Sequence, residues 1–384
     1  MLLLQQKNIK PEIELRLVVV MPKKLLLAIF MLVAIFLLGA CSCIPQARAK
    51  GPIYIRTDGT VDPSTAPIQR EENVYFLTEN VTADEYGIVV EKDDIIIDGN
   101  GYVLYGTGSS TSKGVSVSSR NNITIRNFVI ELWGDGVLIS NSSSIVVSDN
   151  RISNNKFCGI RLADSCSNCT VYGNDISANN ASGIAMQPSN SHCNISANNL
   201  TKHDIGIAVI WSSYCSVQEN NIKDNSVGLS LEWSWNNSVS NNEITANSQI
   251  GIHFTYSSSN IVFGNNITNS LEGVKIDHSS NNALYHNRFI NNAIQANTTV
   301  GSINGWDNGY PSGGNYWNDF VDTDQNRGPN QDQLGSDGIW DNPYLIDNNN
   351  IDNYPIVPEF SSTLIISTFM IATLVAVVIQ RRKH

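Results

Sequence analysis

The sequence predicts an all-β solenoid, a single-stranded parallel β-helix, and three observations support this prediction. A glycine followed by an aliphatic residue recurs every 22–24 residues. An asparagine two residues before an apolar residue recurs with a similar step and stays in phase with the glycines. The short apolar runs between them are separated by Gly, Asn and Ser, which is typical of strands joined by turns rather than of helices.

Both series run through the middle of the chain, and each repeat has room for three short strands and three turns. A leucine-rich repeat has a similar length, but its Leu-x-x-Leu-x-Leu frame is absent. The glycine series is Gly136-Val137, Gly159-Ile160, Gly183-Ile184, Gly206-Ile207, Gly228-Leu229, Gly251-Ile252 and Gly273-Val274. The asparagine series is Asn127/Val129, Asn150/Ile152, Asn174/Ile176, Asn198/Leu200, Asn220/Ile222, Asn242/Ile244, Asn265/Ile267 and Asn287/Phe289.

Stacked coils place equivalent residues about 4.8 Å apart, so columns of Asn can hydrogen-bond along the stack and satisfy buried amides. A further inward column changes from cysteine to asparagine along the chain and predicts a second buried ladder. Its members are Cys169, Cys193, Cys215, Asn237, Asn260 and Asn282. Two alternatives for the cysteines are a metal site that includes the C-x-x-C of Cys166 and Cys169 with His192, and a Cys158–Cys166 disulfide.

The two ends of the chain predict export and membrane anchoring. A basic Pro22-Lys23-Lys24, an apolar stretch and an Ala47-Arg48-Ala49 cleavage frame read as a signal peptide. Ser361–Ile379 is apolar enough to span a bilayer, and the basic residues after it place the preceding chain outside the cell. Pro358-Glu359-Phe360 resembles archaeal PEF-type sorting tags.

These features divide the chain into five parts. They are the N-terminal extension and signal (1–49), the N-terminal cap and first coils (50–113), the β-helix repeats (114–303), an Asp- and aromatic-rich C-terminal cap (304–357), and the tag, transmembrane helix and basic tail (358–384).

Composition agrees with a surface address. The formal net charge is −11 and only 15% of residues are charged, which argues against a nucleic-acid partner. Ten Asn residues lie in N-x-S/T frames and predict a glycoprotein. They are Asn80, Asn122, Asn141, Asn168, Asn180, Asn194, Asn199, Asn236, Asn266 and Asn297.

Two segments resemble the NosD-like family of right-handed β-helix proteins, within the carbohydrate-binding and sugar-hydrolase group of pectin-lyase-like folds. The first is IIIDGNG at 95–101, which precedes the repeats. The second is GNYWNDF at 314–320 together with DGIWDNPYLID at 337–347 and DNYP at 352–355. The resemblance implies a right-handed coil. It leaves the function open, because this group holds lyases, hydrolases, epimerases and non-catalytic surface proteins.

An aromatic column is the main functional candidate. Counting from each repeat's glycine, the fifth following position should lie at the end of a strand. Over four successive repeats it holds Trp211, Trp233, Tyr256 and His278. Aromatic rings on an exposed surface are suited to binding the flat faces of sugars, although the same rings could instead cover the sheet edge.

Charged residues on neighbouring outward positions are the candidates for catalysis. Glu232, His253, Lys275 and Asp277 should lie beside the aromatic column. A lyase needs a base with a cation, and a glycosidase needs two carboxylates about 5–10 Å apart. Solvated surface charge is the alternative interpretation.

Metal binding is predicted in one segment. Asp319, Asp322, Asp324, Asp337 and Asp341 form an Asp-rich region whose turn-like spacing suits Ca²⁺, with a polar cap as the alternative. A copper role, which the NosD resemblance implies, would need clustered Met, Cys or His. The exported region offers only Met186 and scattered His203, His253, His278 and His286 besides the column cysteines.

Together these patterns predict an exported β-helix protein at the cell surface, held by its C-terminal helix. Its expected partner is an extracellular glycan or envelope component, bound without catalysis or contacted as an adhesion scaffold. The rivals are a polysaccharide lyase or glycoside hydrolase and a NosD-like copper-maturation accessory protein.

Overall fold

The computed structural model describes residues 51–358. The predicted signal peptide and the predicted span Ser361–Ile379 lie outside this range. Between residues 51 and 358 the chain forms strands and turns, with no helix capable of crossing a membrane.

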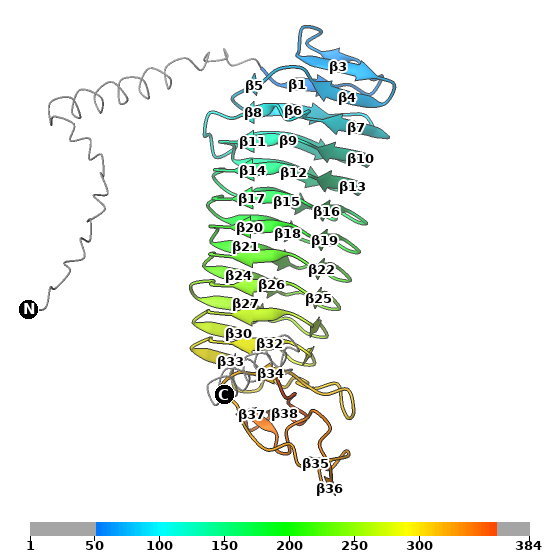
Figure 1. Ribbon diagram of the computed structural model, residues 1–384. Coiled ribbons are helices and arrows are strands. Elements are labelled where there is room, and N and C mark those ends of the chain that lie inside the picture. Colours follow the sequence, from blue (N-terminus) through cyan, green and yellow to red (C-terminus); the bar gives the residue numbers. More distant parts are fainter. Residues whose placement is uncertain (1–50, 359–384) are drawn as a thin grey trace, which may run out of the picture. The chain divides into compact units, whose positions relative to one another are not determined.

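The described chain is a parallel β-helix, in which each coil contributes one strand to each of three long sheets (Figure 1). We call these sheets A, B and C. Sheet A consists of β2 (Val61–Asp62), β1 (Ile53–Ile55), β6 (Tyr86–Val90), β9 (Lys113–Ser118), β12 (Asp135–Ser140), β15 (Ile160–Ala163), β18 (Ser182–Gln187), β21 (Ile205–Ile210), β24 (Val227–Glu232), β27 (Ile250–Thr255), β30 (Glu272–Asp277) and β33 (Ile294–Thr298), in spatial order.

The other two long sheets follow the same order of coils. Sheet B consists of β3 (Ile68–Glu71), β4 (Val74–Leu77), β7 (Ile95–Asp98), β10 (Asn121–Arg126), β13 (Ser143–Ser148), β16 (Thr170–Tyr172), β19 (Asn194–Ser196), β22 (Ser216–Gln218), β25 (Ser238–Ser240), β28 (Ile261–Phe263) and β31 (Ala283–Tyr285). Sheet C consists of β5 (Val81–Thr82), β8 (Val103–Tyr105), β11 (Val129–Glu131), β14 (Arg151–Ser153), β17 (Asp175–Ser177), β20 (Asn199–Thr201), β23 (Asn221–Lys223), β26 (Glu243–Thr245), β29 (Asn266–Thr268), β32 (Arg288–Ile290) and β34 (Tyr316–Trp317).

The recurring glycine is explained by the close approach of neighbouring coils. A Cβ atom on Gly206 would lie 2.6 Å from the carbonyl oxygen of Gly228 and 2.6 Å from Ile222 Cγ2. No side chain fits there, so the column keeps glycine while the aliphatic residue after it enters the core. Ile207 and Leu229 are paired in register and fully buried.

The predicted Asn ladder is present over most of the stack. Each side-chain amide donates to the side-chain oxygen of the next member at 2.9–3.0 Å, from Asn150 through to Asn315. Asn127 is an exception to the prediction. The register pairs Val129 with Arg151, so Phe128, not Asn127, lies beneath Asn150. Asn127 is exposed and donates to Asp98 instead.

The predicted Cys-to-Asn column lies in one buried line. Successive strand pairings align its six members, and the amide N–H of Cys215 donates to Asn237 Oδ1 at 2.9 Å where the residue type changes. All five cysteines between residues 51 and 358 are buried free thiols, so the Cys158–Cys166 disulfide is absent. Burial raises the pKa of Cys158 to about 11, as expected of an unreactive core thiol.

A third ladder runs along the turn between sheets C and A, and one of its members is a histidine. The ladder contains Asn155, Asn179, His203, Asn225 and Asn247. His203 Nδ1 accepts from the Asn179 amide at 3.1 Å, and its Nε2 lies 3.1 Å from the Ile176 carbonyl. Burial lowers the pKa of His203, which therefore remains neutral as a ladder member.

The two ends of the stack are closed differently. At the N-terminal end, the antiparallel pairs β1–β2 and β3–β4 cover the first coils. At the C-terminal end, two small hairpins follow the last coil, namely β35 (Asn326–Arg327) with β36 (Gln333–Leu334) and β37 (Tyr344–Asp347) with β38 (Asn350–Asp352).

Strand β38 supplies the acceptors that terminate two ladders. Asn350 Oδ1 accepts from the Asn304 amide at 3.0 Å, and Asp352 Oδ2 accepts from the Asn315 amide at 2.7 Å. Asp352 also accepts from the indole of Trp317 at 2.9 Å. These contacts explain two of the segments singled out in the sequence. GNYWNDF contains Asn315, the last residue of the Asn ladder, and DNYP contains Asp352, which accepts the hydrogen bond from its amide.

Candidate functional site

The candidate site lies where sheet A turns into sheet B, over the coils that begin with β18, β21, β24, β27 and β30. We call these five turns the A–B corner. They comprise residues 188–193, 211–215, 233–237, 256–260 and 278–282. The outer face of sheet A adjoins the corner, so both candidate sets predicted from the sequence meet in this region.

The predicted aromatic column forms one continuous stack along the A–B corner. Trp211 and Trp233 have ring centroids 5.0 Å apart, Trp233 and Tyr256 4.3 Å, and Tyr256 and His278 4.9 Å, with interplanar angles of 2–23°. The three larger side chains remain 41–48% exposed. The side chains of all four make no hydrogen bond to any residue within 51–358.

Stacking changes what the column presents to a ligand. The rings cover one another's faces, so within the column the surface exposed to solvent consists of ring edges, indole N–H groups and a phenol hydroxyl. Ring edges carry partial positive charge, and with these donors they favour contacts to oxygen acceptors. The expected platform of open ring faces is therefore replaced by a ridge of edges.

The residues of the aromatic column share the left-handed backbone that recurs in the turns of the coils. All four residues adopt the left-handed region, with φ of 48–50°. Bulky L-residues rarely occupy this region, which costs about 1–2 kcal/mol per residue. Asn141 and Asp164 hold the same position in earlier coils, with φ of 46° and 54°, and these residue types tolerate the conformation better. The aromatic residues thus replace better-suited ones over four coils.

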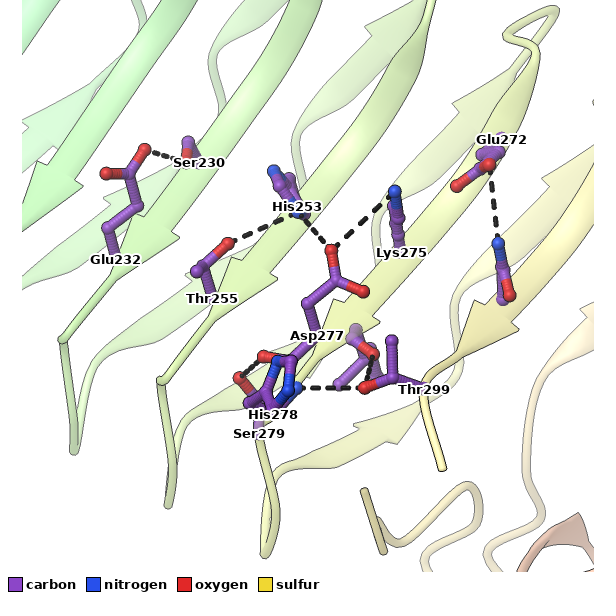
Figure 2. Close-up of polar contacts among 12 residues, drawn as sticks. Ser230, Glu232, His253, Thr255, Glu272, Lys275, Asp277, His278, Ser279 and Thr299 are labelled. Atoms are coloured by element: carbon purple, nitrogen blue, oxygen red, sulfur yellow. Dashed lines mark hydrogen bonds and ion pairs between the residues drawn. The ribbon is translucent and has the colours of Figure 1, made fainter. Parts of the chain in front are cut away.

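The predicted charged residues occupy the outer face of sheet A, and three of them are in contact (Figure 2). His253 Nε2 lies 2.9 Å from Asp277 Oδ2, and Lys275 Nζ lies 3.6 Å from the same oxygen. Thr255 Oγ1 is 3.2 Å from His253 Nε2. We call His253, Lys275 and Asp277 the sheet A patch.

Glu232 lies apart from the sheet A patch. It accepts a hydrogen bond from Ser230 at 3.0 Å and is on β24, two strands from Asp277 on β30. Two coil spacings correspond to about 9.6 Å between the backbones. A single carboxylate with an imidazole and an ammonium could hold and move a proton, but the paired carboxylates of a glycosidase are not brought together closely here.

A second set of aromatic residues on the A–B corner was missed from the sequence. His192 and Tyr214 stack with centroids 5.5 Å apart and an interplanar angle of 12°. Tyr214 and Trp235 are 57% and 43% exposed. This column was hard to recognise because its residue type is not maintained: Tyr214 and the members after it lie eight residues after a repeat glycine, and His192 lies nine. Counting back six residues from each ladder Asn would have found it, at His192, Tyr214, Asn236, Ser259 and Asn281.

The five predicted calcium ligands accept hydrogen bonds from other residues of the C-terminal cap, and Asp337 accepts from the amide of Ile339. Asp324 accepts from the amides of Asp337 and Gly338, Asp341 accepts from Asn326, and Asp322 accepts from Asn342. Asp319 accepts from the hydroxyl of Tyr344. No three His, Cys, Asp or Glu side chains within 51–358 converge as a metal-binding group.

The Met, His and Cys residues of the described chain do not fit a copper site. Met186 is buried in the core, His203 is a ladder member and the thiols are enclosed between coils. His253 and His278 lie on the surface, where His253 contacts Asp277 and the ring of His278 stacks on Tyr256. Met186 and the histidines are therefore dispersed over the described chain, and the stacked thiols, which lie together, are buried in the core away from them.

Comparison with known families finds two matches. Residues 188–321 match the family described as "Periplasmic copper-binding protein (NosD)", and residues 71–222 match "Right handed beta helix region". The comparison with curated proteins gave no significant match.

Solved structures with the same fold include enzymes and phage proteins. The A-module of a mannuronan C-5 epimerase from Azotobacter vinelandii is 17% identical, with a TM-score of 0.44 over 60% of this chain and 78% of that chain. A periplasmic alginate epimerase is 14% identical, with a TM-score of 0.46 over 67% and 82%. The tailspike protein of E. coli bacteriophage HK620, solved with a pentasaccharide, is 12% identical, with a TM-score of 0.46 over 63% and 55%. At these identities the likeness extends to the fold alone.

The two family matches overlap and together cover the coils from residue 71 to residue 321, in which the Gly and Asn columns set the register. The chain therefore combines a NosD-like region at residues 188–321 with a right-handed β-helix region at residues 71–222.

Proposed function

We propose that this protein is exported, is held at the cell surface, and binds an extracellular glycan through the aromatic column of the A–B corner. The observation that carries the proposal is that four stacked aromatic residues stand exposed in a left-handed backbone with unpartnered donors. Exposed aromatic side chains with unpartnered donors are typical of binding surfaces.

An energetic comparison supports binding over packing. Three stacked pairs contribute about 0.5–1.5 kcal/mol each. Four left-handed bulky residues cost about 1–2 kcal/mol each. The stacking energy therefore does no more than offset the cost of the left-handed backbone. The aromatic residues are better explained by a partner outside the chain, whose hydroxyl oxygens the free N–H and O–H groups would bind.

The test uses the full-length protein with Trp211 and Trp233 both changed to Asn, the residue type found at position 141 of the same column. We expect affinity for the bound polysaccharide to fall at least tenfold, because exposed aromatic anchors contribute most of the energy of such contacts. Affinity electrophoresis against a panel of polysaccharides measures this. Asp164→Asn, in the same column, is the matched control and should bind as the wild type does.

Unchanged binding by the double variant would refute the role of the aromatic column. Loss of thermal stability together with unchanged binding would assign the rings to packing. Failure of the wild-type protein to bind any polysaccharide would favour an adhesion or envelope scaffold without a glycan ligand.

A polysaccharide lyase is the second candidate, and the contact of His253, Lys275 and Asp277 favours it. In such a reaction an imidazole could remove a proton from the sugar while the ammonium stabilises the charge that develops. Release of new sugar ends by the wild type and its loss in Asp277→Asn would establish catalysis. Glu272→Gln, on the same strand as Lys275 and Asp277, is the control. No release by the wild type would leave the site as a binding surface.

A further inference from the structure

We infer that the ligand of the A–B corner is a neutral glycan chain that lies along the solenoid axis, with successive sugar units on successive coils. This inference rests on the proposed function and specifies its ligand. Three observations carry it, namely a second column of aromatic residues, an absence of charge, and a regular series of free donors.

The second column widens the surface beyond the ridge. His192 and Tyr214 stack on each other, and Trp235 is exposed one coil further on. Strand pairing places Trp235 directly over Ser213 and beside the position of Tyr214. The far face of Tyr214, opposite His192, is directed toward the next coil, where the same column holds the small side chain of Asn236. No ring contacts this face within the described residues, and Tyr214 is 57% exposed, more than any ring of the first column whose exposure is given above.

The A–B corner is uncharged. The five turns at residues 188–193, 211–215, 233–237, 256–260 and 278–282 contain no Asp, Glu, Lys or Arg. Earlier turns in the same line do carry charge, at Arg120 and Asp164. A chain of net charge −11 would repel a polyanion, and this corner holds no cation to attract one. An uncharged ligand with many hydroxyl groups fits best.

Free polar groups recur on three successive coils of the corner, at residues 211–215, 233–237 and 256–260. The indole N–H groups of Trp211, Trp233 and Trp235 and the hydroxyls of Tyr214 and Tyr256 have no partner within residues 51–358. The side chains of Ser213, Asn236 and Ser259 are also unpartnered there. These groups repeat with the coil spacing of about 4.8 Å. That spacing is comparable with the length of one sugar unit in an extended chain, so a glycan parallel to the axis can meet a new set of donors at each unit.

The experiment compares two polysaccharide probes, a neutral mannan and the acidic polyuronate alginate, by isothermal titration with the full-length protein. We expect the mannan to bind and its affinity to change less than twofold between about 0.1 M and about 1 M salt, because neutral contacts are not screened. Tyr214→Ser combined with Trp235→Ser should weaken mannan binding at least tenfold without lowering the Tm. Serine is the residue that Ser259 and Ser258 supply at these positions in the next coils.

Tyr172→Ser is the matched control, since Tyr172 is a similarly exposed aromatic on sheet B and has Ser196 as its neighbour in register. Its binding should equal that of the wild type. Tighter binding of alginate than of mannan, lost at high salt, would overturn the inference and leave the proposed function intact. Full mannan binding by the Tyr214/Trp235 variant would also overturn it. Binding of neither probe, nor of any other polysaccharide, would refute the proposed function itself.

Discussion

The buried Asn ladder and the exposed aromatic column obey one construction rule, in which like residues stack at each coil, but only the ladder is complete within the protein. Asn242 donates to Asn265 and to the Val217 carbonyl at 2.9 Å and accepts from Asn220 at 3.0 Å. Trp233 is stacked on both sides, yet its N–H has no partner within residues 51–358 and its backbone is left-handed.

This difference separates residues that stabilise the fold from residues available to a partner. A closed set of hydrogen bonds lowers the free energy of the folded chain and has nothing left to offer a ligand. A set of groups without partners in the protein adds little to the stability of the fold, but these groups remain available to bind a ligand. The contrast can be tested by two kinds of substitution, one that removes a ladder Asn and one that removes exposed rings of the aromatic column.

Replacement of one ladder Asn by an apolar residue should have the largest effect on stability. Asn242→Leu would leave the backbone amide of Asn220 and the carbonyl of Val217 without their ladder partner, at about 1–3 kcal/mol for each buried group. We expect the free energy of unfolding to fall by about 4 kcal/mol. Urea unfolding followed by circular dichroism measures this.

Asn281→Ser serves as the control for that measurement. Asn281 is exposed, and Ser259 occupies its position in the preceding coil with a similar left-handed backbone. Its free energy of unfolding should change by less than about 0.5 kcal/mol. Equal effects of the two substitutions would mean that the ladder is not the source of stability.

Asp352, which terminates the ladder, should make stability depend on pH. Burial raises the pKa of its carboxyl from 3.8 to about 7. The folded state therefore holds a proton that the unfolded state releases between about pH 4 and pH 7. The stability that this proton provides is complete below about pH 4 and is lost as the pH rises to 7.

Asp352→Asn should remove that pH dependence, worth up to about 4 kcal/mol across the window, while keeping an acceptor for Asn315. The difference in Tm between wild type and variant, measured from pH 4 to pH 8, isolates the effect from other carboxylates. A difference that is constant with pH would show that Asp352 does not titrate in this range.

Removal of two rings from the aromatic column should have the smallest effect on stability. The Trp211/Trp233 double change to Asn removes two stacked pairs, about 0.5–1.5 kcal/mol each, and relieves two left-handed residues, about 1–2 kcal/mol each. We expect Tm to be unchanged or to correspond to a gain of about 1 kcal/mol. A loss of about 3 kcal/mol or more, as for truncating a buried ring, would mean that the rings are structural.

Much of the fold was predictable because its columns repeat. The step between glycines reflects a close approach of backbones that permits no side chain, and the ladder Asn reflects an amide that must be satisfied in the core. Asn127 shows the limit of this reasoning. It has the right neighbour in sequence but is one residue out of register, and only the strand pairing reveals that Phe128 takes its place.

The site was harder to predict because side-chain contacts decide it. The sequence places Trp211 and Trp233 in one column, but it does not show that their rings cover one another. It groups Glu232 with Asp277, although Glu232 binds Ser230 and only His253 and Lys275 reach Asp277. Tyr214 and Trp235 were missed because the next coils hold Asn236 and Ser258 at their positions, so no run of aromatic residues marks them.

The terminator on β38 bears on how such proteins change length. Asn350 and Asp352 contact the last member of each ladder through a backbone amide, and the ladders carry the same amide at every coil. The cap also contacts the indoles of Trp306 and Trp317, so it closes the stack through the last coil, whatever the number of coils before it. Duplication or deletion of a whole repeat would leave the closure intact, so the solenoid can be lengthened or shortened in single steps while its ends stay the same.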